Sequence, residues 1–129
     1  MPAGERGAVF EITERIMPRS SAEILVFTAL ACTAGLSEEF LYRGFVFAVF
    51  VRIFASSTFS VSIAAVLSSL WFGVAHLYQG RRGIITTCVV GMIFCLAKIF
   101  SRSLFPPIAA HIGVDLIAGI FISTVLRRS

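Results

Sequence analysis

Charged residues are scarce in this sequence. Only 14% of the 129 residues are charged, whereas 57% are hydrophobic and the mean hydropathy is +0.92. This composition excludes an ordinary soluble domain and indicates an integral membrane protein that contacts the lipid bilayer. The formal net charge is +4, but the eleven Lys and Arg residues stand in ones and twos at the ends of apolar runs. That distribution predicts no nucleic-acid partner, because charges in such places usually orient membrane helices.

The sequence also lacks the patterns of a disulfide framework, a cysteine metal site and a cleavable signal peptide. Its three cysteines, Cys32, Cys88 and Cys95, lie inside apolar runs without metal-type spacing, so we expect them in the core. Residues 1–19 mix charged and apolar residues, with no positive stretch before an apolar one. We predict a cytoplasmic N-terminal segment over 1–19, either an amphipathic helix on the membrane surface or a disordered tail.

Long apolar runs follow from residue 20 onward. Residues 20–53, 58–77, 83–100 and 106–126 can each cross a bilayer, so residues 20–129 are predicted to form an all-α, polytopic bundle of about four transmembrane helices. One straight helix over 20–53 would be about 50 Å long, so it must tilt or kink, with Gly35 or Gly44 as the expected irregular points. The Arg and Lys distribution predicts that both termini lie in the cytoplasm. We expect an integral protein of the plasma membrane of a prokaryote.

Three ionisable residues interrupt the first apolar run. Each charge at the centre of a membrane helix costs roughly 2.5 to 3.5 kcal/mol on insertion scales, so Glu38, Glu39 and Arg43 need a reason to be there. Glu39 and Arg43 are four residues apart on one helix face, so we expect an ion pair between them. Glu38 points about 100° away and remains for chemistry. The alternative is a buried ion-pair network that only fixes helix packing.

The two histidines lie in other apolar runs, each with a partner at helical spacing. Phe72 precedes His76 by four residues, and Asp115 follows His111 by four. Taken alone, His76 could be a surface residue at the level of the lipid headgroups. His111 and Asp115 could be a packed, hydrogen-bonded pair within one helix. Polar groups on three helices instead favour one shared polar intramembrane cavity. A simple up-and-down bundle keeps the histidines apart, so we expect residues 58–77 to extend toward Gly80, the helices to tilt, or the third crossing to be partial.

The three polar motifs resemble those of a known family. EEFLYR, FGVAH and HIGVD are similar, in this order, to the Glu-Glu-x-x-x-Arg, Phe-x-x-x-His and His-x-x-x-Asn/Asp motifs of the CAAX-protease and bacteriocin-processing (CPBP or Abi) family. The resemblance covers roughly residues 22–126. It implies an intramembrane endopeptidase that cleaves a membrane-associated protein or peptide. It further implies that Glu38 is a general base that activates a water, and that His76 shares this water. His111 and Asp115 would form the pair that stabilises the oxyanion. The supporting residues would be Glu39, Arg43 and Phe72.

Asp115 departs from the family members that have Asn at this position. An ionised carboxylate cannot donate a hydrogen bond to an oxyanion, so Asp115 could instead orient His111. A zinc site made by Glu38, His76 and His111 is a further alternative. We expect no cofactor, because the His-Glu-x-x-His spacing of zinc proteases is absent.

Other functions remain open from sequence. One is a non-catalytic bacteriocin-immunity or membrane scaffold protein of the same family, and another is a small transporter with a carboxylate proton relay. A short chain of this kind could also need a homodimer or a partner membrane protein to close its cavity.

Overall fold

The computed structural model describes residues 17–55 and 57–126, and every regular element within them is helical. The fold is therefore all-α, as predicted. The predicted surface helix falls on residues 1–19, most of which lie outside the described residues. In chain order the elements are α2 (Ser21–Glu39), the π-helical segment η1 (Phe40–Val46), α3 (Phe47–Ile53), α4 (Ser60–Ala75), the 3₁₀ turn η2 (Leu77–Gln79), α5 (Gly80–Ser101) and α6 (Phe105–Leu126).

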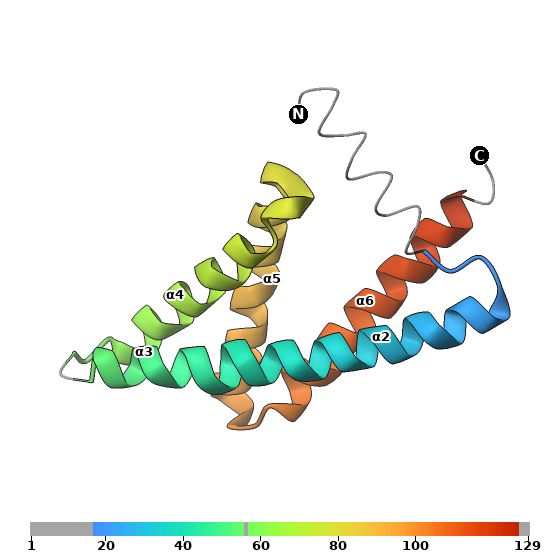
Figure 1. Cartoon of the computed structure of the whole chain (residues 1–129). Helices are drawn as coiled ribbons and strands as arrows, with labels where there is room; N and C mark the ends of the chain where they lie inside the picture. The colour runs from blue at the N-terminus through green and yellow to red at the C-terminus, as the bar shows by residue number, and fades with distance from the viewer. Residues whose placement is uncertain (1–16, 56, 127–129) are drawn as a thin grey trace.

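The first three elements form one continuous helix that the others pack against (Figure 1). It starts at Ser21 and is capped by Ser20, whose hydroxyl accepts a hydrogen bond from the Glu23 N–H at 3.2 Å. The irregularity expected at Gly44 is present, because Gly44 lies within η1. Gly35 instead lies in regular helix, where the missing side chain admits α6: a Cβ at Gly35 would lie 2.7 Å from the Ile112 side chain.

The long helix changes partner along its length. Its first part, α2, packs against α6, whereas α3 packs against α4. The junction is the end of α2 and the π-helical segment, which also contacts α4 and α5. Side chains at this junction can therefore meet residues from all three other long helices, and π-helical segments are frequent at functional sites.

Three helical stretches are long and apolar enough to span a membrane: residues 21–53, 77–101 and 105–124. Large apolar side chains on them face outward, as Leu25 (73% exposed) and Phe100 (83%) illustrate. The small core between α3, α4 and α5 centres on Phe47, Ala64 and Cys95. Outward apolar surface on this scale fits a lipid environment, so the chain is an integral membrane protein.

The bounds of two helices differ from those predicted. Residues 58–77 do not form one helix toward Gly80: α4 has 16 residues and ends at Ala75, giving about 24 Å of helix. The third predicted run, 83–100, begins too late, because α5 begins at Gly80 and includes Arg81 and Arg82. Of the three arrangements expected from the sequence, helix tilt is present, because α4 and α6 cross the long helix obliquely (Figure 1).

Candidate active site

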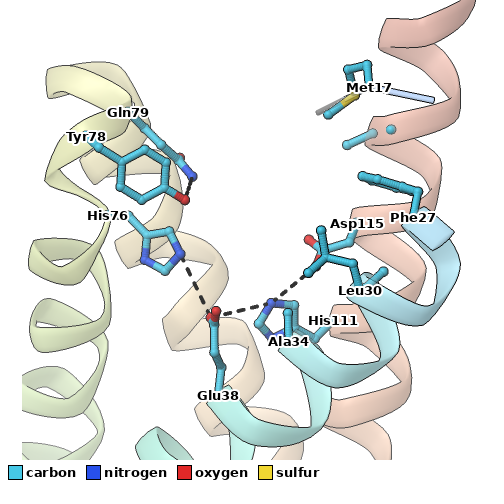
Figure 2. Close-up of a pocket in the computed structure, with 13 residues that line it drawn as sticks. Met17, Phe27, Leu30, Ala34, Glu38, His76, Tyr78, Gln79, His111 and Asp115 are labelled. Carbon is cyan, nitrogen blue, oxygen red and sulfur yellow. Dashed lines mark hydrogen bonds and ion pairs between the residues drawn. The ribbon is translucent and has the colours of Figure 1, made fainter. Parts of the chain in front are cut away.

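Glu38 lies in the last turn of α2, at the junction, between the two histidines (Figure 2). Its Oε2 is 3.9 Å from His76 Nε2 and 3.8 Å from His111 Nε2. This oxygen is buried and has no hydrogen-bond partner among the described residues. Distances near 4 Å are too long for direct hydrogen bonds but allow one water to touch all three atoms.

His76 lies at the C-terminal end of α4, and a contact with the preceding turn fixes its ring. The chain leaves α-helical geometry at His76, and its Nδ1 lies 2.8 Å from the carbonyl oxygen of Phe72. A carbonyl oxygen only accepts, so Nδ1 carries the proton and donates it there. The Phe72 ring packs edge-on at 4.7 Å between centroids. In the neutral ring, Nε2 therefore presents a lone pair toward Glu38.

His111 is held in the same tautomer by a different partner. Its Nδ1 lies 2.8 Å from Glu39 Oε1, and its ring stacks on Phe94 at 5.2 Å between centroids. The side chain is only 9% exposed, so this contact is screened little by solvent. Nδ1 donates to the carboxylate, which leaves His111 Nε2 facing both Glu38 and Asp115, with Asp115 Oδ2 at 3.7 Å.

The Glu39–Arg43 ion pair that the spacing predicts is present and fully buried. Arg43 Nη1 lies 2.8 Å from Glu39 Oε1, and Nη2 donates to the Gly91 carbonyl oxygen at 3.1 Å. The guanidinium carbon lies 4.2 Å from the centroid of the Phe72 ring, a cation–π contact. One carboxylate oxygen thus accepts from Arg43 and from His111, so the ion pair is joined directly to the histidine.

A cavity of about 380 Å³ opens beside Glu38, His76, His111 and Asp115. Its wall is otherwise mostly apolar and comes from α2, from α6 and from Met17, which precedes α2; η2 adds two polar residues. The other apolar lining residues are Phe27, Leu30, Ala31, Ala34, Ala118 and Gly119, and the two from η2 are Tyr78 and Gln79. The cavity could admit a peptide segment with apolar side chains beside the polar cluster.

Tyr78 and Gln79 line the cavity but were not predicted from the sequence as site residues. The one available signal was their position directly after the FGVAH motif. Among residues 17–55 and 57–126, no three His, Cys, Asp or Glu side chains are arranged to hold a metal ion.

Comparison with protein families gives one match. Residues 20–117 match the family model described as type II CAAX prenyl endopeptidase Rce1-like. Searches of curated proteins and of solved structures each find no match. The matched region spans most of the chain and includes Glu38, His76, His111 and Asp115. The chain therefore belongs to the type II CAAX prenyl endopeptidase Rce1-like family, whose members are proteases of the membrane.

Proposed function

We propose that the chain is an intramembrane endopeptidase in which Glu38 activates the water that attacks the peptide bond. One observation supports this most strongly. The unpartnered Oε2 of Glu38 lies 3.9 and 3.8 Å from the Nε2 atoms of His76 and His111, at the wall of a 380 Å³ cavity. A carboxylate, two ring nitrogens and a peptide-sized space are the parts that hydrolysis by an activated water requires.

The proton balance follows from the tautomers. Both Nδ1 atoms already donate, so the neutral histidines offer acceptors to a water at Glu38. The water can donate one hydrogen bond to Glu38 and the other to His76. As the water oxygen bonds to the carbonyl carbon, Glu38 takes one proton and the carbonyl electron pair moves onto its oxygen. When the C–N bond breaks, Glu38 gives that proton to the leaving nitrogen and returns to its carboxylate form.

The role of His111 as an oxyanion donor carries a condition. Its Nε2 can donate only when the ring is doubly protonated, because Nδ1 is committed to Glu39. A protonated His111 would lie between Glu39 and Asp115, two carboxylates that balance its charge. We therefore propose that Asp115 acts on His111 and does not itself donate to the oxyanion.

A zinc-dependent mechanism is the alternative for the same site. The lone pairs of His76 Nε2 and His111 Nε2 together with the Glu38 carboxylate are chemically suitable zinc ligands. Their arrangement does not form a metal-binding group in the described part of the chain. We therefore favour metal-free hydrolysis, and chelation tests that choice.

We also propose that both termini face the cytoplasm. Arg81 and Arg82 lie in the first turn of α5, and Figure 1 places this turn at the same end of the molecule as the end of α6. Basic residues at one end of a membrane bundle favour the cytoplasmic side. Accessibility labelling of single cysteines introduced at 81 and 128 in intact cells would test this: protection of both supports it, and labelling of either contradicts it.

The function is tested by incubating the purified full chain, in lipid, with prenylated CAAX peptides and with a library of membrane-anchored peptides. Wild type, Glu38→Gln and wild type with a zinc chelator are compared by mass spectrometry. Cleavage that is lost in Glu38→Gln and kept under chelation supports the metal-free mechanism. Loss under chelation would move the mechanism to zinc. No cleavage by folded wild type would favour a non-catalytic immunity or scaffold protein, or a requirement for a second copy or partner protein.

A further inference from the structure

The cavity is short of hydrogen-bond donors at the place where an oxyanion must form. His76 and His111 each use Nδ1–H within the protein, on Phe72 and Glu39. Their Nε2 atoms and the Glu38 carboxylate are acceptors, and an ionised Asp115 is another. The negative oxygen of a tetrahedral intermediate requires donors aimed at it, and with the carboxylates ionised only a doubly protonated histidine supplies one from these residues.

Tyr78 supplies a donor on the wall of the cavity opposite Asp115 (Figure 2). Its hydroxyl oxygen accepts a hydrogen bond from Gln79 Nε2 at 3.1 Å, so its own proton is directed elsewhere. Figure 2 shows this hydroxyl and the Gln79 amide extending from the η2 side into the cavity, on the side where His76 faces Glu38. The Tyr78 ring lies 5.7 Å from the His76 ring between centroids.

The turn that presents Tyr78 is built around the Gln79 side chain. The Gln79 N–H donates to the His76 carbonyl at 2.9 Å, which closes the turn immediately after the catalytic histidine. Thr87 Oγ1 donates to Gln79 Oε1 at 3.4 Å. Gln79 lies directly over Gly83, where any Cβ would collide with the Gln79 side chain. Gly83 and Thr87, both in α5, therefore hold the Gln79 amide in place. This amide in turn orients the Tyr78 hydroxyl.

We infer that Tyr78 is a further catalytic residue, whose hydroxyl donates a hydrogen bond to the oxyanion, and that Gln79 is its positioning residue. This inference depends on the proposed function. No proton leaves Tyr78 in the step: the water oxygen bonds to the carbonyl carbon, the carbonyl electron pair moves onto oxygen, and Tyr78 stabilises that charge. The pair returns to the carbonyl when the C–N bond breaks and the nitrogen takes the proton held by Glu38.

Tyr78→Phe tests the inference, because it removes the hydroxyl and keeps the ring. We expect kcat on a cleaved peptide to fall about 100-fold, the scale for removing one oxyanion donor, with KM nearly unchanged. Gln79→Leu should lower kcat by less, about 10-fold, because Tyr78 keeps its proton but loses its orientation. Trp71→Phe is the control: Trp71 is as exposed as Tyr78, at 60%, and does not line the cavity.

Two readouts separate a catalytic from a structural role. Unfolding of Tyr78→Phe in detergent should match wild type, so a loss of kcat cannot be attributed to misfolding. A peptide aldehyde, whose hydrate mimics the tetrahedral intermediate, should lose potency in Tyr78→Phe in proportion to kcat/KM. An unchanged kcat, or a change confined to KM, would overturn the inference. If Tyr78→Phe cleaves normally while Glu38→Gln is inactive, only this inference fails; if wild type cleaves no peptide, the proposed function fails and takes this inference with it.

Discussion

The buried Glu39–Arg43 pair should show strong energetic coupling, because both side chains are fully buried and each depends on the other. Glu39→Gln leaves Arg43 as a buried positive charge without its carboxylate. The remaining partners are all neutral: the new amide oxygen, the Gly91 carbonyl and the rings of Tyr42, Phe72 and Phe94. Removing one partner of a buried pair typically costs about 3 to 5 kcal/mol. Arg43→Met leaves the carboxylate with His111 alone, so we expect a penalty near the lower end of that range.

The double variant removes both charges and should cost clearly less than the two single variants added together. We expect a coupling free energy of about 2 to 3 kcal/mol, near the upper end for contacting residues. The measurement is equilibrium unfolding in mixed detergent and dodecyl sulfate for wild type, both single variants and the double variant. Additive penalties, agreeing within about 0.5 kcal/mol, would refute the claim that this pair stabilises the junction of the long helix.

Two glycine substitutions test the packing around the site. Gly35→Ala places a methyl group against Ile112 and should lower the free energy of unfolding by about 1 to 3 kcal/mol. Gly113→Ala lies in open space and should be neutral or stabilise by up to about 1 kcal/mol. Equal effects of the two substitutions in unfolding experiments would contradict the close approach of α2 and α6. Gly80 has φ 72° and ψ −179°, a conformation that is strained for other residues. Gly80→Ala should therefore lower the free energy of unfolding by about 1 to 3 kcal/mol and reduce cleavage by displacing Tyr78. Unchanged unfolding and cleavage would contradict the inference that the η2 turn positions Tyr78.

Sequence reasoning predicted contacts around the candidate site where each motif is local. The i,i+4 spacing of Glu39 and Arg43 is a property of one helix, so their ion pair could be predicted without knowing the fold. Long apolar runs likewise indicated the helices. His76 and Phe72 are also four residues apart, and the contact of the His76 ring nitrogen with the Phe72 carbonyl occurs within that same turn.

The features that were missed depend on contacts between helices. Hydropathy continues through Leu77, so composition does not reveal that α4 ends at Ala75 and that η2 follows. The proximity of His76 and His111 arises because the long helix passes from α6 to α4 at its π-helical segment. An up-and-down arrangement of the same helices would separate these histidines. The contribution of Tyr78 to the cavity follows from the η2 turn and from the packing of this turn on α5.

The most direct test of the account is the cleavage rate of Glu38→Gln relative to wild type on one identified peptide in lipid. Glutamine has nearly the same shape but cannot take a proton from water, so the rate should fall about 100- to 10,000-fold while unfolding is little changed. Glu23→Gln, at the exposed start of the same helix, is the matched control and should cleave like wild type. A folded Glu38→Gln protein that cleaves at the wild-type rate would contradict the central claim that Glu38 activates the water.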